Sequence, residues 1–413
     1  MNRFKLCVLT IIVLLNTSLF GADLTGSLKP GKAGLKSASQ LAFGPDGILF
    51  VGDSRQAAVF AIATEDTKPA AAAPKVDIKG INSKIAALLG TMPDQILIND
   101  IKVNPLSHKV YMAVSRGRGP DGVPVILQID GFGNISEFAL NNVRYSMVSL
   151  PDAPEQKPDA SVKGPEGLVN PNPRVRTITD LSYVDGKVVV AGLSNEDFAS
   201  DLHSIPFPFK TAGNGTGIRI WHSSHGRYET AAPVDKFIPY TIDRQQYILA
   251  SYACTPLVKI PIKALNPGSK VEGTTIAELG SHNTPLEMFA YKKEGHDYIL
   301  VAGSTRGVMK LSVDNLGKYN PITPPTATCQ DSHGEQGQPG PRAPKECMGD
   351  VAGVPYQTLT DLKGVWQVAK IDDGHAIVLA DSKGGTPKLV EGNASQFTLD
   401  PATTLDLTTI PLP

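Results

Sequence analysis

The chain has 413 residues, with 39 Lys and Arg against 40 Asp and Glu, so its formal net charge is −1 at pH 7. A nearly neutral chain lacks the strongly basic face that nucleic-acid binding requires, and we expect no nucleic-acid partner. The chain is also rich in Gly (39) and Pro (33). This composition favours many short strands joined by turns over a bundle of long helices.

The N-terminus has the pattern of an export signal. Arg3 and Lys5 precede an apolar run from Leu6 to Leu15, and small residues follow up to Ala22. This pattern predicts a cleavable signal peptide over residues 1–22 and a mature protein in the periplasm or outside the cell. No later segment reaches the ~20 apolar residues of a membrane-spanning helix, so we expect no membrane span.

One strand pattern recurs six times along the chain. Each copy has an apolar stretch, a turn with Asp or Gly, and a β-branched run that ends in small residues. The copies are Leu41–Asp53, Ile101–Ser115, Leu181–Ser194, Tyr240–Ser251, Met288–Ser304 and Val365–Ser382. Their spacing of about 45 to 80 residues fits four-stranded blades. The pattern therefore predicts an all-β fold, a single β-propeller of about six blades over residues 23–413.

A further apolar segment follows each copy and is the predicted third strand of its blade. These segments are Val59–Ala63, Val125–Ile129, Ile218–Trp221, Leu257–Ile262, Val308–Val313 and Lys388–Val390. The ring must close to remove exposed strand edges, and Leu24–Leu28 and Leu405–Ile410 are the candidate closing strands. A seventh, degenerate blade built from the termini and a β-sandwich are the alternatives.

Three segments interrupt the repeat. Ser83–Leu89 has the pattern of a short helix, and the insertions at about 152–173 and 323–356 are long irregular loops of the kind that often carries function. In an oxidising compartment Cys329 and Cys347, both in the second insertion, are the natural disulfide pair. Cys254 is then left over, as a buried small apolar residue or a reactive thiol.

The first copy carries the motif Phe43-Gly-Pro-Asp-Gly-Ile-Leu-Phe-Val-Gly-Asp-Ser54. It resembles the blade core of the propeller group that includes NHL-repeat proteins and gluconolactonase-like and strictosidine-synthase-like enzymes. The resemblance is clear over one blade and concerns the fold. Members of this group divide between enzymes with a metal or an acidic residue on the axis and binding proteins without chemistry, so fold alone does not decide function.

The resemblance to gluconolactonase-like members implies a divalent ion on the axis, held by an acid on the first inner strand and by Asn and Asp on later ones. This chain has Ser39 and Gln40 where the first acid is expected, which puts the site in doubt. The remaining candidate ligands are Asn99, Asp100, Asp180 and Glu287. Such oxygen ligands suit calcium or magnesium. The alternative is that these side chains cap turns and bind backbone amides.

Propeller topology groups a second set of residues. The loops between the second and third strands of the blades lie on one face, called here the upper face, and several carry a cation. These cations are Arg55, Arg116, Arg118, Arg306 and Lys383. Converging guanidinium groups would bind a small anionic molecule or a protein partner through paired hydrogen bonds. The alternative is a set of solvated turn residues.

Cys254 belongs to the same face, and His282 lies in the next connection between blades. A thiolate and an imidazole on one rim could bind copper or zinc or act as nucleophile and base. The alternative is a buried thiol beside a hydrogen-bonded histidine.

Three hypotheses about function follow. The first is a binding propeller whose upper face recognises a small anionic ligand or a partner protein. The second is a metal-dependent extracytoplasmic enzyme, a lactonase-like hydrolase or an oxidoreductase, with its ion on the axis or the rim. The third, by analogy alone, is a redox accessory protein. Motifs of common hydrolases and nucleotide-binding enzymes are absent from the sequence.

Overall fold

The computed structural model describes residues 24–118, 121–156, 172–223, 226–254, 256–280, 283–323, 351–390, 393–398 and 402–413. For the strands at 388–390 and 393–398 it describes the backbone alone. The predictions of a signal peptide and of a Cys329–Cys347 disulfide lie outside these residues and stay predictions. Within the described residues, no helix has the length and apolar character needed to cross a bilayer.

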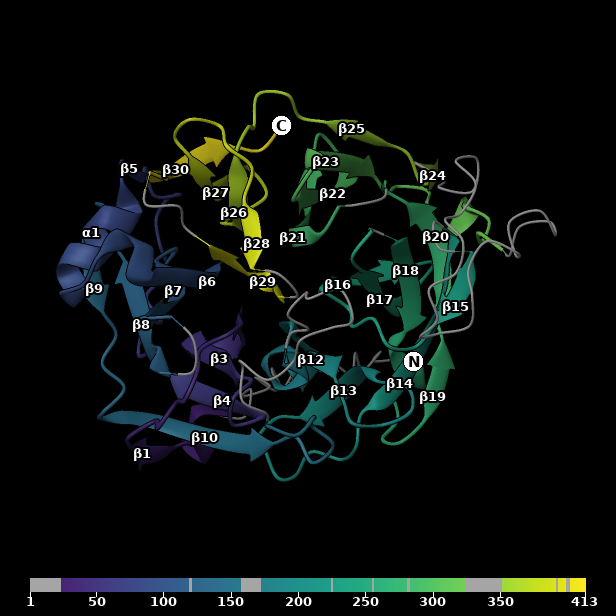
Figure 1. Cartoon of the computed structure of the whole chain (residues 1–413), viewed down its shortest axis with the longest axis horizontal. Helices are drawn as coiled ribbons and strands as arrows, with labels where there is room; N and C mark the ends of the chain where they lie inside the picture. The colour runs from purple at the N-terminus through teal and green to yellow at the C-terminus, as the bar shows by residue number, and fades with distance from the viewer. Residues whose placement is uncertain are drawn as a thin grey trace, which may run out of the picture.

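The described strands form six antiparallel blades around a central axis, which confirms the predicted β-propeller (Figure 1). Blades are numbered here by the order of their innermost strands along the chain. These innermost strands are β2 (Leu41–Phe43), β6 (Ile96–Val103), β11 (Asp180–Val184), β16 (Lys236–Ile242), β21 (Pro285–Lys293) and β26 (Val365–Lys370). They line the axis, and the later strands of each blade lie progressively farther from it.

The second strands pair antiparallel with the innermost ones. They are β3 (Ile48–Asp53), β7 (Val110–Arg116), β12 (Lys187–Leu193), β17 (Gln245–Ser251), β22 (His296–Gly303) and β27 (His375–Asp381). Several of these first hairpins turn through two residues with positive φ, as at Asp185 (48°) and Gly186 (76°). This geometry matches the twist of the strands, which is why the Asp-Gly signals in the sequence located the hairpins.

The third and fourth strands complete the blades. The third strands are β4 (Ala58–Ala63), β8 (Val123–Ile129), β13 (Ser200–Pro206), β18 (Pro256–Pro261), β23 (Gly307–Ser312) and β30 (Leu405–Pro411). The fourth strands are β10 (Val143–Ser149), β9 (Ile135–Glu137), β14 (Thr216–His222), β20 (Thr274–Glu278), β25 (Tyr356–Thr358) and β5 (Asp77–Ile78).

Short strands extend some blades, and one hairpin stands apart. β1 (Lys29–Gly31) pairs with β10, β15 (Arg227–Glu229) and β19 (Lys270–Glu272) pair with β14, and β24 (Ala352–Gly353) pairs with β20. The hairpin β28 (Lys388–Val390) and β29 (Asn393–Thr398) is inserted between the second and third strands of blade 6. The helix α1 (Ile81–Leu89) confirms the predicted helical insertion.

Two predicted third strands are wrong. Ile218–Trp221 lies in β14, the fourth strand of blade 3, because β13 (Ser200–Pro206) precedes it in the sheet. Lys388–Val390 is β28 of the inserted hairpin, and β30 is the third strand of blade 6. In blade 3 the third strand Ser200–Pro206 is largely polar and was not recognised as a strand, so the next apolar segment was taken in its place. In blade 6 the inserted hairpin separates the second strand from the third, and its first strand was taken for the third strand of the blade.

The predicted closing strands also need correction. Leu24–Ser27 forms a short 3-10 helix, and Leu405–Pro411 is an ordinary third strand of blade 6. The outer strand of blade 6 is instead β5, which pairs Ile78 with Leu407. Segments more than 300 residues apart therefore join in one sheet and remove an exposed strand edge.

The blades do not follow one another around the ring in chain order. Contacts between innermost strands give the circular order β2, β6, β26, β21, β16, β11, so that blade 2 stands between blades 1 and 6. After blade 1 the chain runs out to β5 on blade 6, builds blade 2, and returns along the outside of blade 1 as β10 before entering blade 3 (Figure 1). We call this path of the chain, from blade 1 through blade 2 to blade 3, the crossing. Its strands β5 and β10 pair with blades 6 and 1 and hold it in place.

The hydrophobic core lies between the blades. Distinct clusters of buried residues join blades 1 and 3, 1 and 2, 3 and 4, and 4 and 5, and a larger one joins blade 2 to blades 5 and 6. Each inner strand is covered by a neighbour on both faces, so its apolar residues run continuously instead of alternating, as in the fully buried β3. The axis is the place where this apolar packing ends and polar side chains collect.

Candidate functional site

Eight polar side chains meet at the axis, and we call them the axial cluster. They are Gln40, Asn99, Asp100, Lys102, Asp180, Lys236, Glu287 and Gln367. All but Lys102 are buried, and the Lys102 side chain is 21% exposed. In β6, β21 and β26 the pairing register shifts just before the cluster residue. Such bulges redirect a side chain, and here they precede Asp100, Glu287 and Gln367.

The carboxylates of the cluster accept hydrogen bonds from backbone amides of the inner strands. Asp100 Oδ2 accepts from the amide of Leu41 at 2.7 Å, which joins blade 2 to blade 1. Asp180 Oδ2 accepts from the amide of Phe237 at 2.8 Å, which joins blade 3 to blade 4. These two acids therefore perform the amide-binding role that the sequence offered as the alternative to metal ligation.

Two lysines supply the positive charge of the cluster. Lys102 Nζ donates a hydrogen bond to Glu287 Oε2 and lies 3.4 Å from Asp100 Oδ1. Lys236 Nζ donates to Gln40 Oε1 at 2.6 Å and lies 3.8 Å from Asp180 Oδ1. Three carboxylates thus face two ammonium groups in a space largely shut off from water.

In this arrangement the carboxyl groups have different pKa values. Burial raises the pKa of Asp180 to about 6, against the opposing effect of Lys236 and Lys102. Burial also raises the pKa of Asp100. At Glu287 burial acts upward as well, but Lys102 and Lys236 outweigh it and lower the pKa. Burial lowers and the neighbouring carboxylates more strongly raise the pKa of Lys102, so this lysine stays protonated.

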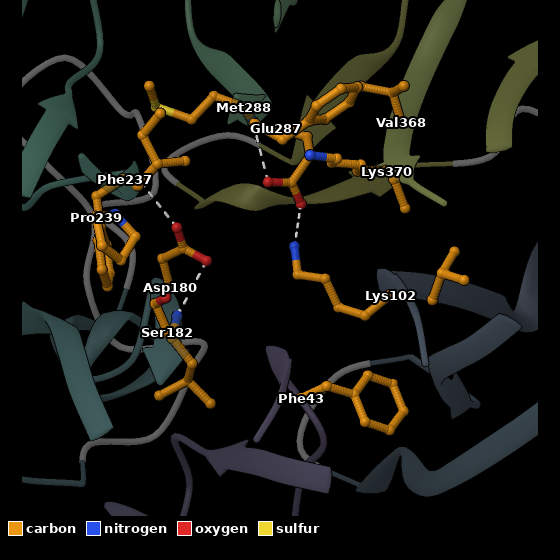
Figure 2. A pocket seen from close by; sticks show the side chains of 15 residues that line it. Phe43, Lys102, Asp180, Ser182, Phe237, Pro239, Glu287, Met288, Val368 and Lys370 are labelled. Atoms are coloured by element: carbon orange, nitrogen blue, oxygen red, sulfur yellow. Dashed lines mark hydrogen bonds and ion pairs between the residues drawn. The ribbon is translucent and has the colours of Figure 1, made fainter. Parts of the chain in front are cut away.

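A pocket of about 180 Å³ opens beside the cluster (Figure 2). The side chains of Lys102, Asp180 and Glu287 reach into it from three different blades, as Figure 2 shows. Its wall continues along the inner strands to their ends at Phe43 and Lys370, so it extends away from the upper face. Apolar residues form most of this wall, and its polar members are Lys102, Asp180, Ser182, Glu287 and Lys370. The ammonium group of Lys370 already donates to the carbonyl of Ala290 at 3.0 Å and to Asp373 at 2.6 Å.

Several buried polar atoms of the cluster lack hydrogen-bond partners among the described residues. They are Gln40 Nε2, Asn99 Oδ1 and Gln367 Oε1. The opposite ends of these amides are engaged, since Gln367 Nε2 donates to the carbonyl of Asn99 at 3.0 Å. Buried polar groups are nearly always paired with protein, water or ligand, so the axis has unfilled capacity for polar contacts.

The inserted hairpin of blade 6 lies next to the axis. The backbone of β29 runs beside β6 and β21, two of the strands that carry the cluster (Figure 1). Because the hairpin belongs to a connection between second and third strands, it stands on the upper face. The axis is therefore flanked by the hairpin at its upper end and by the pocket at its lower end.

The four axial candidates from the sequence all belong to the axial cluster, and their binding of a divalent ion stays a prediction. Within the cluster the amide of Asn99 donates to the carbonyl of Ala38 at 2.8 Å. Sequence reasoning missed both lysines. A signal for Lys102 was present, because it stands two residues after Asp100 on one strand and so faces the same way.

Two of the upper-face cations donate hydrogen bonds to backbone carbonyls of the segment that precedes blade 2. Arg116 Nη1 donates to the carbonyl of Leu89 at 3.5 Å, and Arg118 Nε donates to the carbonyl of Asp94. Both arginines thus bind the segment around α1 and the turn after it.

The remaining cations stand on other blades. The guanidinium group of Arg306 lies against Gly280, where a Cβ atom would come within 2.4 Å of Nε. Arg55 is half-buried and Lys383 is exposed. Binding of an anion or a partner by Arg55, Arg116, Arg118, Arg306 and Lys383 stays a prediction.

Of the two residues predicted to form a metal site on the rim, Cys254 and His282, the structure describes Cys254. Cys254 is a half-buried free thiol whose φ is 61°, and His282 lies outside the described residues. A copper or zinc site of these two residues stays a prediction.

Comparisons with known proteins identify no family for this chain. No family model and no curated protein matches the chain. Among solved structures it is similar to the PQQ-bound aldose sugar dehydrogenase of Streptomyces coelicolor, with 12% identity, coverage of 93% of this chain and 97% of that chain, and a TM-score of 0.29. It is also similar to the WD40 β-propeller domain of Doa1 (8% identity, 93% and 97% coverage, TM-score 0.26). A third similar structure is the Cellvibrio cellulosa α-L-arabinanase complexed with arabinohexaose (10% identity, 69% and 94% coverage, TM-score 0.28).

Proposed function

We propose that this propeller binds a small polyhydroxylated molecule in its axial pocket. The observation that carries the proposal is the meeting of Lys102, Asp180 and Glu287 in one pocket of about 180 Å³. An ammonium group only donates hydrogen bonds and an ionised carboxylate only accepts them. A hydroxyl does both, so neighbouring hydroxyls of one ligand can satisfy the two kinds of group together.

The charge of the axial cluster and the volume of the pocket restrict which ligands can bind there. Three carboxylates and two ammonium groups give the ionised cluster one net negative charge, which disfavours an anion at this place. The pocket is smaller than the roughly 300 Å³ at which ordinary ligand sites begin. A neutral ligand about the size of a single sugar ring, partly held in the pocket, fits both conditions better than an organic acid or a peptide.

Isothermal titration calorimetry of the full chain tests the proposal. The panel contains neutral polyols and monosaccharides, with citrate and phosphate as anions for comparison. Binding of a polyol that falls at least tenfold in Lys102→Met and in Asp180→Asn supports the pocket. The control is Lys187→Met, an exposed lysine of β12. Binding that is unchanged in both pocket variants, or absent across the panel, contradicts the proposal.

The same titration tests the upper face. An anion that binds the wild type and loses affinity in Arg116→Ala and Arg306→Ala, while the pocket variants retain it, would favour the anion-binding hypothesis. Loss in the pocket variants alone would favour the axis. The two hypotheses therefore predict opposite sets of sensitive residues.

A second candidate function rests on the split acidities of the pocket carboxyls. Burial raises the pKa of Asp180 to about 6, whereas the lysines hold that of Glu287 low. A protonated and an ionised carboxyl at one pocket are the groups that a hydrolase uses as general acid and general base. Turnover of a polyol ester or lactone, lost in both Asp180→Asn and Glu287→Gln, would establish this role. The metal-dependent version, with Asn99, Asp100, Asp180 and Glu287 around one calcium or other divalent ion, stays a prediction.

A further inference from the structure

A second cluster of ionisable groups lies away from the axis, where the chain passes from blade 1 to blade 3. Asp152 follows the end of β10 by three residues, and Asp201 and His203 stand on β13. Their exposed fractions are 4%, 3% and 6%. One ligand atom from each of the three side chains lies within 4.8 Å of the others.

The hydrogen bonds of the His203 ring determine which of its two nitrogens has a free lone pair. His203 Nε2 lies 2.9 Å from Asp152 Oδ1, and Asp152 Oδ2 accepts from the amide of Gly215 at 2.7 Å. An ionised carboxylate only accepts, so Nε2 must carry the hydrogen of this bond. In the neutral ring Nδ1 then presents its lone pair, and it faces Asp201 Oδ2 at 3.5 Å.

The carboxylate of Asp201 is the unsatisfied member of the group. Among the described residues neither of its oxygens accepts a hydrogen bond, although both are buried. A lone pair on Nδ1 and an anionic oxygen that face each other repel unless a proton or a metal cation stands between them. Two ligand atoms bound at about 2.1 Å to a tetrahedral ion lie about 3.4 Å apart, which matches the observed gap.

A cavity lies beside the two carboxylates of this cluster, and His203 is not among the residues that line it. Asp152 and Asp201 line this cavity of about 110 Å³, together with Ser194, Glu196 and Asn214. Glu196 and Asn214 are exposed and hydrogen-bonded to each other at 3.3 Å, so oxygen groups stand at the solvent side of the cavity. Lys270 also lines the cavity, and its Nζ lies over the ring of Phe198, 4.7 Å from the ring centroid.

We propose that Asp201 and Nδ1 of His203 bind a divalent first-row transition-metal ion, zinc above all, and that Asp152 orients the histidine through Nε2. Imidazole nitrogen suits zinc better than it suits calcium or magnesium, and a carboxylate that holds the second ring nitrogen is a common feature of metal-bound histidines. Water and oxygens of the cavity complete the coordination. This site is independent of the axial pocket and of the function proposed for it.

The position of the site gives the ion a structural role. β10 is the outer strand of blade 1, and the chain that leaves it must be held against blade 3 to keep the crossing in place. Asp152 lies on that departing chain, and the two ligands lie on blade 3. An ion at this place therefore links the crossing to the ring and stabilises the folded chain by mass action.

The test uses the full chain after dialysis against a chelator, titrated calorimetrically with Zn²⁺, Mn²⁺ and Ca²⁺ separately, with thermal unfolding followed in parallel. We expect one Zn²⁺ per chain, weaker Ca²⁺, and a higher Tm with zinc. Asp201→Asn and His203→Gln should weaken Zn²⁺ binding at least tenfold. Asp152→Asn should weaken it about 10-fold to 100-fold as a positioning residue. Asp197→Asn, in the same loop region but exposed, is the matched control.

Two results would overturn the proposal. Zinc binding that persists unchanged in Asp201→Asn and His203→Gln would place the ion elsewhere on the chain. Absence of Zn²⁺ and Mn²⁺ binding at millimolar concentration would mean that the histidine carries a second proton instead of facing a metal. Asp201→Asn removes a buried unpaired charge, so we expect this variant to fold, and its Tm without metal checks that directly.

Discussion

Lys236 donates a hydrogen bond to Gln40 at 2.6 Å, and the bond crosses the axis between blades 4 and 1, which blade 3 separates in the ring. Lys236 is 4% exposed and also lies 3.8 Å from Asp180. Lys236 thus binds the side-chain oxygen of Gln40 and balances the charge of Asp180, whose carboxylate also accepts from the backbone amides of Leu181 and Phe237.

Replacing this lysine should be costly. In Lys236→Met the carboxylate of Asp180 loses its nearest cation while remaining buried, and removal of one partner of a buried pair typically costs about 3–5 kcal/mol. We expect a loss of that order in the free energy of unfolding, measured by denaturant titration. Lys187→Met, at an exposed position, should change it by less than about 0.5 kcal/mol. A loss below about 1 kcal/mol in Lys236→Met would show that the ion pair is not structural.

Asp180 should make stability depend on pH. Its pKa is raised to about 6 by burial, above the ~3.9 of an unfolded aspartate, so the folded state holds the proton more tightly. The contribution of this group to the free energy of unfolding should therefore fall as pH rises from about 4 through 6 and stay level above. Asp180→Asn should remove this fall, which is on the order of 2 kcal/mol.

The measurement compares wild type with Asp180→Asn in denaturant titrations at pH 4.5 and 7.5. The difference in unfolding free energy between them should shift in favour of the variant at the higher pH. Asp197→Asn, whose side chain is 93% exposed, should show no such shift. An equal difference at both pH values would contradict the raised pKa.

Gly215 should not tolerate a side chain. A Cβ atom there would lie 1.9 Å from Asp201 Oδ1, so Gly215→Ala must displace the carboxylate. We expect a loss of about 1–3 kcal/mol in unfolding free energy, as in other overpacked sites, together with weaker zinc binding. Gly34→Ala is the control, because its Cβ would meet nothing within 4 Å. Wild-type zinc affinity in Gly215→Ala would separate this glycine from the proposed site.

Asn82 should anchor α1 to blade 6. Its Nδ2 donates to the carbonyl of Thr403 and its Oδ1 accepts from the amide of Leu405, both at 3.0 Å. Asn82→Ala leaves those two backbone groups without a partner, at a cost of about 1–3 kcal/mol each when buried. Hydrogen exchange of β30 amides should accelerate in this variant and not in Ser83→Ala on the exposed side of the helix. Equal protection in both variants would contradict the anchor.

Cys254 occupies a backbone conformation that favours glycine. At φ 61° a residue with a Cβ carries a strain of about 1–2 kcal/mol, which glycine avoids at some entropic cost. Cys254→Gly should therefore raise the unfolding free energy by up to about 1 kcal/mol, while Cys254→Ala keeps the strain and gains nothing. Both are measured under reducing conditions. Destabilisation by glycine would point to a packing or binding role for the thiol.

Much of the architecture could be predicted from short sequence patterns. Runs such as Ile48–Asp53 are apolar throughout because a blade is covered on both faces, and Asp-Gly turns such as Asp185-Gly186 mark the hairpins between such strands. The number of blades followed from these local patterns. Asp100, Asp180 and Glu287 became candidates through the resemblance to gluconolactonase-like proteins, which implies polar side chains on the inner strands.

Other features depend on which strands pair over long distances. The crossing of blades 1 and 2, and the sealing of blade 6 by Asp77–Ile78, involve segments whose sequences carry no sign of their partners. The metal site was hidden for a related reason, because β13 was not recognised as a strand and Asp201 and His203 were therefore not placed on one face. Asp152 lies on the connection that leaves blade 1.

The sequence by itself determined the repeat and the apolar strands, since each of these is a pattern of a few adjacent residues, and a family resemblance added the acids on the axis. Only the tertiary structure decided the circular order of the blades, the lysines that face those acids, and the meeting of Asp152 with Asp201 and His203. The physical reason is that strand patterns are local, whereas charge pairing and ligand geometry depend on distances that the closed ring alone establishes.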